Sequence, residues 1–181
     1  KPAKPYKVFF YARPYESRNA FEIGIAGLKK IKERFGNDIN IYAAGSEWDP
    51  EEFELEGKII NLGKIPYDNL ARFYRSMDVG VMFMFSGHPG VVASELMASG
   101  CPVVVNEYND ETWNELYIDG ETCLVTPPTA SIIAEKISEL ISNIELRTKI
   151  IKLAENKANE FYGNYHEECE KTFNYIKKPI N

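Results

Sequence analysis

Apolar and polar residues follow two rhythms along this chain. Short apolar runs rich in β-branched and aromatic residues, typical of buried strands, are separated by longer segments in which apolar side chains recur every three or four residues, as on one face of a helix. Strands and helices that alternate in this order predict an α/β fold: a Rossmann-like, doubly wound parallel sheet of about six strands with helices on both faces. The predicted strands are 6–12, 39–44, 58–62, 79–85, 103–105 and 123–125, and the predicted helices are 20–35, 67–77, 91–99, 113–118, 129–142, 145–161 and 165–177, with 49–57 irregular.

The segment 79–105 is the most informative part of this pattern. It reads as a strand, a loop broken by Gly87, Pro89 and Gly90, a helix stopped by Gly100, and a second strand. The loop therefore follows the carboxyl end of a parallel strand, and in open α/β sheets the crevice at these ends holds the ligand.

One charged residue in this unit stands among apolar neighbours. Glu95 follows Gly90 by five positions, just over one turn into the predicted helix. A carboxylate there can accept hydrogen bonds from a ribose diol, while the N–H groups of the helix start near Gly90, Val91 and Val92 favour an anion, because the first turn of a helix has no intrahelical acceptors for its N–H groups. Together they suit a nucleoside diphosphate. The alternative is a solvated helix residue without a ligand, and the pattern alone leaves both open.

Two arginines flank the loop after the first predicted strand. Arg13 and Arg18 would open onto the same crevice, where two guanidinium groups can grip a diphosphate. The alternative is that both are surface residues paired with acidic neighbours such as Glu16 and Glu22.

His88 lies between Gly87 and Pro89 in the central loop. We expect it to contact a ligand rather than to transfer a proton, because no carboxylate nearby in the sequence would orient it. Core or surface packing is favoured over base stacking for the aromatic residues near loops, which are Tyr11, Tyr15, Tyr67, Tyr108 and Trp113.

The composition of the chain excludes several classes of function. The chain has 181 residues and a net charge of −6, which makes nucleic acid an unfavourable partner. The three scattered cysteines and two separated histidines match no metal spacing. The odd number and scatter of the cysteines indicate a reducing, cytoplasmic compartment. No apolar run reaches membrane-spanning length and no signal peptide is visible. The first residue is Lys1 and not Met, so we expect a fragment of a longer chain.

At this point several motifs resemble a known family. Residues 90–103, GVVASELMASGCPV, resemble the signature Gly-x4-Glu-Ala-Met-Ala-x-Gly-x-Pro-Val of retaining GT-B glycosyltransferases of family four (glycosyl transferases group 1). Arg13 and Arg18 match an Arg and a Lys of the family's first loop at the same spacing. Further matches to the C-terminal, donor-binding half of these enzymes lie at residues 62–65, 70–79, 115, 119–120 and 124–125.

The resemblance implies a role for each matched residue. Glu95 would bind the ribose diol, Arg13 and Arg18 would bind the diphosphate and stabilise it as a leaving group, and Gly90 to Val92 would complete the phosphate cradle. The base pocket would be lined by the segment that contains Lys64, Ile65 and Tyr67. The donor would be a nucleotide sugar, with no cofactor and no metal. An N-terminal acceptor domain, absent from residues 1–181, would complete the enzyme, so the chain alone would transfer sugar weakly or not at all. Association with the cytoplasmic face of the membrane would come through that missing domain.

The central loop departs from the family pattern. Gly87 stands where the first Glu of a Glu-x7-Glu pair is usual, and Gly87-His88-Pro89 replaces Glu-Gly-Phe. His-Pro in the central loop occurs here together with Arg-Pro and Arg-Asn in the first loop. This set of residues resembles the pattern of a subgroup similar to bacterial rhamnosyltransferases of surface-glycan assembly. This makes a deoxysugar donor such as dTDP-rhamnose a candidate.

Three other functions compete with a glycosyltransferase. Gly87 could mark a degenerate donor site in a non-catalytic binding module. A GT-B sugar-nucleotide epimerase would use the same nucleotide contacts without an acceptor. A receiver-type regulatory domain needs clustered acidic residues at strand ends, and the sequence has none there.

Overall fold

A computed structural model describes residues 2–86, 90–108, 115–163 and 167. Their elements alternate along the chain as the pattern predicts. The strands are β1 (Tyr6–Ala12), β2 (Ile39–Gly45), β3 (Ile60–Asn61), β4 (Val79–Met82), β5 (Val103–Asn106) and β6 (Leu124–Thr126). The helices are α1 (Phe21–Phe35), α2 (Tyr67–Arg75), α3 (Val92–Ala98), α5 (Ala130–Ser142) and α6 (Ile144–Tyr162), with short 3-10 helices at Gly36–Asp38 and Pro50–Phe53.

The six strands form one parallel sheet in the order β3-β2-β1-β4-β5-β6. The chain runs outward from β1 to β3, returns to the centre, and runs outward again from β4 to β6. The order therefore reverses between β1 and β4, which pair from Val8 with Val79 to Phe10 with Val81. In doubly wound sheets this reversal opens a crevice at the carboxyl ends of the two central strands.

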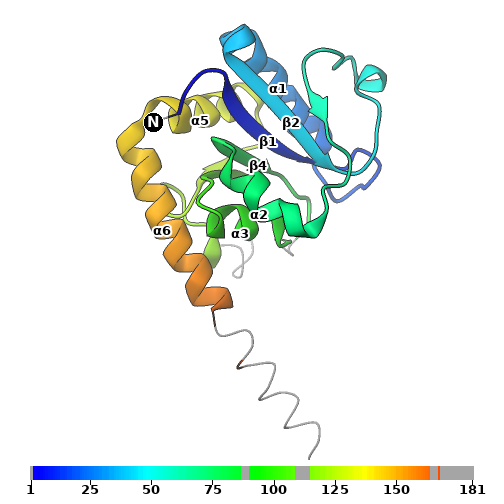
Figure 1. The fold of residues 1–181 in the computed structure, drawn as a ribbon. Coiled ribbons are helices and arrows are strands. Elements are labelled where there is room, and N and C mark those ends of the chain that lie inside the picture. The colour runs from blue at the N-terminus through cyan, green and yellow to red at the C-terminus, as the bar shows by residue number, and fades with distance from the viewer. Residues whose placement is uncertain (1, 87–89, 109–114, 164–166, 168–181) are drawn as a thin grey trace, which may run out of the picture.

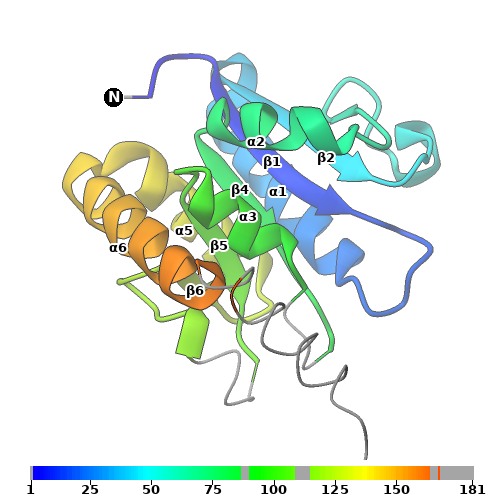
Figure 2. The same cartoon turned by 60° about the horizontal axis from the view of Figure 1, so that its bottom comes forward.

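Helices cover both faces of the sheet, with α1 on one side and α2 and α3 on the other (Figures 1 and 2). Along β1, Val8, Phe10 and Ala12 belong to a core cluster that contains α1 and α5 residues, whereas Phe9 belongs to the cluster that contains α2 and α3 residues. Burial on both faces explains why the strands read as nearly continuous apolar runs.

The α1 helix packs closely because two of its residues are glycines. A Cβ at Gly27 would lie 2.3 Å from Cγ2 of Ile133 on α5, and a Cβ at Gly24 would lie 2.3 Å from Cζ of Phe10 on β1. These contacts occupy the space that a side chain would need, so glycine is required for packing and not for helix formation.

We expect Gly27→Ala to lower the free energy of unfolding by about 1–2 kcal/mol, because the cost of overpacking a core exceeds the gain in helix propensity. Urea denaturation measures the change. Ala26→Gly, at an exposed position of the same helix, measures how much the difference in helix propensity between alanine and glycine changes the free energy of unfolding. A Gly27→Ala variant more stable than the parent chain would contradict the expectation.

The predicted fold class is confirmed, and the differences lie at element ends. β3 has two residues instead of five because it pairs with β2 alone at the sheet edge. β4 ends at Met82 and not at Phe85, since β4 and β5 diverge beyond the pair of Met82 with Val105. The irregular segment contains the 3-10 helix Pro50–Phe53. Of the predicted helix 113–118, Trp113 and Asn114 lie outside the described residues, and only Glu115 and Leu116 of the described part are helical. Of the predicted helix 165–177, only residue 167 is described.

Candidate functional site

Two adjoining cavities lie at the carboxyl ends of β1, β2 and β4, where the strand order reverses. Each has a volume of about 340 Å³, and both are lined by Tyr11, Val91 and Val92. We call them the arginine cavity and the glutamate cavity. The arginine cavity is also lined by Arg18, Met82, Met84 and Gly90, and the glutamate cavity by Phe9, Ala44, Gly45, Lys64, Ile65, Leu70, Tyr74 and Glu95.

Glu95 lies half-buried on α3 at the wall of the glutamate cavity. Burial raises the pKa of its carboxyl above the usual value, and a hydrogen-bonding interaction with the Tyr74 hydroxyl opposes this rise. Burial also raises the pKa of Tyr74, so this phenol stays neutral and acts as a donor. Glu95 is therefore not the fully solvated helix residue of the alternative interpretation.

Three predicted base-pocket residues lie near this carboxylate. Lys64 and Ile65 line the glutamate cavity itself. Tyr67, with 79% of its surface exposed, lines a neighbouring groove of about 420 Å³ that also reaches Tyr74 and Glu95. The segment between β3 and α2 thus lies beside Glu95, although the two are far apart in the sequence.

The two arginines of the first loop have different surroundings. Arg18 lines the arginine cavity. The Arg13 side chain forms an ion pair with Glu16, Nη2 to Oε1 at 2.8 Å, and is not among the residues that line either cavity. Arg13 thus pairs with an acidic neighbour, as the alternative expects, but its side chain is only 28% exposed. Its contact with a diphosphate stays a prediction.

The start of α3 borders both cavities. Gly90 has a φ of +68°, a left-handed conformation that glycine adopts without strain. Val91 follows as the N-cap residue, and its carbonyl accepts a hydrogen bond from Ser94 Oγ at 2.8 Å. The main chain of the predicted phosphate cradle therefore adjoins the arginine cavity. Gly87 and His88, also predicted to contact the ligand, lie outside the described residues.

Comparison with known proteins assigns the chain to a family. The family model described as "WsaF, C-terminal domain" matches residues 6–138. The chain belongs to the WsaF C-terminal domain family. This family match includes β1 to β6 and both cavities, so the site lies wholly within the shared part.

Two relatives in sequence are longer than this member of the WsaF C-terminal domain family. It is 40% identical over 146 residues to the O-antigen biosynthesis protein RfbC of Myxococcus xanthus, which covers 81% of the chain and 11% of RfbC. It is 26% identical over 176 residues to MJ1607 of Methanocaldococcus jannaschii, described as an uncharacterized glycosyltransferase, which covers 94% of the chain and 45% of MJ1607. The chain therefore spans less than half of either relative.

Solved structures show the same fold. The crystal structure of HepE from Anabaena in complex with UDP-glucose has a TM-score of 0.74 and 17% identity, covering 94% of this chain and 49% of HepE. The fold is one half of a GT-B glycosyltransferase, as the sequence motifs predicted. The resemblance to a C-terminal GT-B domain is confirmed, whereas the narrower resemblance to rhamnosyltransferases stays a prediction.

The sequence assigned no role in the site to eight of the lining residues, which are Phe9, Tyr11, Ala44, Gly45, Leu70, Tyr74, Met82 and Met84. Tyr11 was assigned to packing, and Tyr74 was matched only as part of the donor-binding segment 70–79. Met82 and Met84 were read only as part of a buried strand, yet both line the arginine cavity. Tyr74 carried a usable signal: a phenol that a helix turns inward needs a polar partner, and Glu95 is the polar residue of the helix packed beside it.

Groups that would support other chemistry are inert or absent in the described part of the chain. Burial raises the pKa of the Cys101 thiol and of the Cys123 thiol to about 12, so neither is a nucleophile at neutral pH. No group of three or more His, Cys, Asp or Glu in the described residues could hold a metal ion. None of the described helices is long and apolar enough to cross a membrane.

Proposed function

We propose that this chain is the donor-binding domain of a glycosyltransferase that transfers a sugar from a nucleoside diphosphate sugar to a glycan or another acceptor. The observation that carries the proposal is the pair of adjoining cavities, which are lined by the half-buried Glu95 at one end and by Arg18 at the other. A ligand with a diol and a diphosphate has complementary groups at both ends.

The ligand would lie along the reversal point of the sheet. Its base packs against Lys64 and Ile65, its ribose hydroxyls donate to Glu95, and its diphosphate lies toward Arg18 and the start of α3. During transfer, the bond from the sugar anomeric carbon to the diphosphate oxygen breaks and a bond to the acceptor oxygen forms. Negative charge grows on the diphosphate, where Arg18 stabilises it. Arg13 joins this contact once its ion pair with Glu16 opens.

The comparisons support the same proposal. The family match, the glycosyltransferase description of MJ1607 and the UDP-glucose complex of HepE are consistent with a nucleotide-sugar donor. RfbC is described as an O-antigen biosynthesis protein, which supports a surface polysaccharide as the product. Both relatives have further sequence that could supply the acceptor domain. We therefore expect the chain alone to bind nucleotide and to transfer sugar poorly. We expect the full-length protein to act in the cytoplasm.

Calorimetric titration with UDP, GDP, ADP and dTDP tests the proposal. We expect one nucleotide to bind in preference to the others, and we expect Arg18→Ala and Arg13→Ala to weaken it. Arg34→Ala is the matched control, because Arg34 lies on α1 and contacts Ser138 on α5. Failure of all four nucleotides to bind, or equal binding by the Arg18 and Arg34 variants, would contradict the proposed site.

The affinity for the preferred nucleotide should fall as the pH is lowered. The pKa of Glu95 is raised by burial, and its protonated form is a weaker acceptor for the ribose hydroxyls. Tyr74→Phe removes the interaction that opposes this rise, so the loss of affinity should begin at a higher pH. Titrations from acid to neutral pH measure both effects.

Glu95→Gln provides the control for this pH dependence. It cannot titrate, so its profile keeps only the contributions of the ligand phosphates and of titratable groups other than residue 95. A wild-type profile that superimposes on the Glu95→Gln profile would show that Glu95 does not contribute.

A further inference from the structure

The end of β4 is held by a side chain and not by the neighbouring strand. The ladder between β4 and β5 stops at the pair of Met82 with Val105. Met84 lies two residues beyond Met82. Its N–H donates to Asn106 Oδ1 at 2.8 Å, and its carbonyl accepts a hydrogen bond from Asn106 Nδ2 at 2.9 Å. Asn106 Nδ2 also donates to the Glu107 carbonyl at 2.9 Å. The amide of Asn106 thus continues the ladder where the two strands separate.

Met84 is in turn attached to the first loop. Asn19 and Met84 form an antiparallel bridge, and Asn19 Nδ2 donates to Met84 Sδ at 3.2 Å. The next residue along, Phe85, donates its N–H to the carbonyl of Arg18 at 2.7 Å. Asn19, Met84 and Asn106 are 4%, 3% and 6% exposed, so these contacts lie away from solvent.

The contacts form a connected path from the end of β5 to the arginine cavity. Met84 and Arg18, which this path connects, both line the cavity. Among the described residues, the Arg18 guanidinium has no ion-pair or hydrogen-bond partner. The location of Arg18 is therefore set through its main chain, which Phe85 holds.

We propose that Asn106 is a positioning residue for the diphosphate end of the site: by holding both main-chain groups of Met84, it determines where Arg18 stands at the arginine cavity. Asn106 does not line either cavity, so it acts through other residues and does not touch the ligand. The inference rests on the proposed function, because it assigns the role of Asn106 through the contact between Arg18 and the diphosphate.

The physical reason lies in the cost of unpaired main-chain groups. The strands must diverge to open the crevice, which would leave the buried N–H and C=O of Met84 without partners. Asn supplies one acceptor and two donors on one planar group, and here all three are used. Without this group, the segment from Met84 to Phe85 shifts to find other partners and carries the Arg18 carbonyl with it.

A double-mutant cycle between Asn106 and Arg18 tests the inference. The quantity measured is the ratio of affinities for the diphosphate and the monophosphate of the preferred nucleoside, for example UDP and UMP. We expect Arg18→Ala to reduce this ratio by about tenfold or more and Asn106→Ala to reduce it by about threefold to tenfold. The double variant should match Arg18→Ala within about twofold, because coupled residues are not additive.

Two further variants keep the result interpretable. Asn143→Ala is the matched control: Asn143 also bonds to the main chain, through Leu146 N–H at 3.1 Å, but it caps α6 away from both cavities. It should lower stability and leave the affinity ratio unchanged. If Asn106→Ala does not fold, Asn106→Ser, which retains a donor and an acceptor, enters the same cycle in its place.

The outcomes separate this inference from the proposed function. If Arg18→Ala lowers the ratio but the Asn106 variant leaves it unchanged, acts additively, or weakens monophosphate and diphosphate equally, only the role of Asn106 is overturned. If no nucleotide binds, or if Arg18→Ala leaves the ratio unchanged, the proposed diphosphate contact fails and the inference fails with it.

Discussion

Replacing Glu95 with alanine is expected to weaken binding of the preferred nucleoside diphosphate by about 100-fold. A hydrogen bond to a charged group contributes roughly 1.5–3 kcal/mol, and each 1.4 kcal/mol is about tenfold in affinity. Glu95 is half-buried and lines the glutamate cavity together with Tyr74, so little further ordering opposes its contact with the ribose. Calorimetry with the wild-type chain and the variant measures the loss.

The ligand provides the control for this prediction. The 2′,3′-dideoxy form of the same nucleotide lacks the hydroxyls that Glu95 would accept, so it should bind the two proteins almost equally. Glu135→Ala changes an exposed carboxylate of α5, on the other face of the sheet, and should have no effect. A similar loss with both ligands would place the Glu95 effect somewhere other than the ribose.

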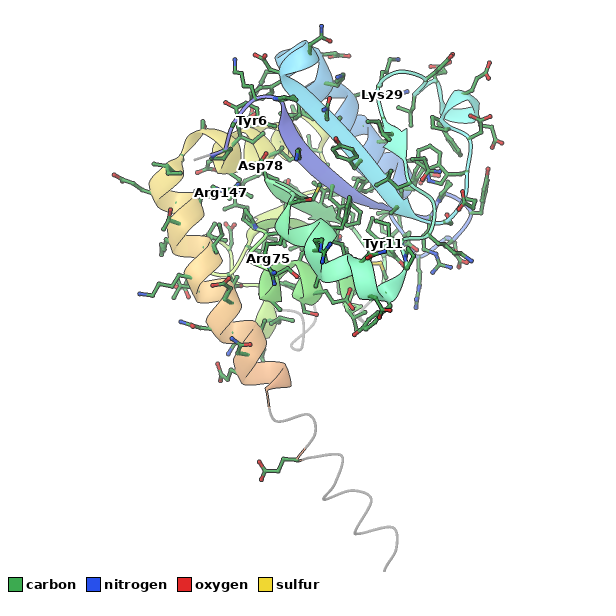
Figure 3. The ribbon with its side chains drawn as sticks, in the orientation of Figure 1. Tyr6, Tyr11, Lys29, Arg75, Asp78 and Arg147 are labelled. Atoms are coloured by element: carbon green, nitrogen blue, oxygen red, sulfur yellow. The ribbon has the colours of Figure 1, made fainter. Side chains whose placement is uncertain are left out.

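The second large effect is expected on stability, when Arg147 is replaced by alanine. Arg147 lies on α6, and its guanidinium reaches the start of β4, where Nη1 donates to the Asp78 carbonyl and Nη2 lies 3.8 Å from Asp78 Oδ1 (Figure 3). The two side chains are only 11% and 18% exposed. Removing one partner of such a pair leaves the other charge uncompensated, which costs about 3 kcal/mol.

Asp78 also links α6 to the centre of the sheet. Its Oδ2 accepts a hydrogen bond from the Lys7 N–H of β1 at 2.8 Å. Urea denaturation should therefore show Arg147→Ala unfolding at a much lower midpoint than the parent chain, with an unchanged slope. Lys4→Ala is the control, since Lys4 pairs with Asp38 at the surface and its removal should leave the midpoint almost unchanged. Equal effects of the two substitutions would contradict the prediction.

The local structure was predicted correctly where a motif consists of residues close together in the sequence. The run from Gly90 to Pro102 predicted the loop, helix and strand around Glu95, because helix periodicity and glycine stops act over a few residues. The segment with Lys64 and Ile65 was assigned to the base pocket through family resemblance alone, and the structure brings it to the glutamate cavity. The arginines show the limit: equal spacing in a motif did not indicate that Arg13 would pair with Glu16 while Arg18 lines a cavity.

The contacts of Asn106 could not be predicted from the sequence. Asn106 reads as a turn residue after a strand, and its partner, Met84, is 22 positions away. Only the divergence of β4 and β5 creates main-chain groups that need a side-chain partner. The same holds for Tyr74, whose apolar ring satisfies the helix pattern while its hydroxyl interacts with Glu95 of another helix.

By itself, the sequence determined the alternation of strands and helices, the parallel sheet and the placing of Glu95 one turn into a helix after a glycine loop. These follow from hydrophobic periodicity and from the backbone preferences of glycine and proline, which are local. Only the tertiary structure decided that β1 lies beside β4, that Arg18 and not Arg13 lines the arginine cavity, and that Asn106 holds Met84. Strand order and side-chain pairing depend on which surfaces meet when the core closes, and no short stretch of sequence contains that information.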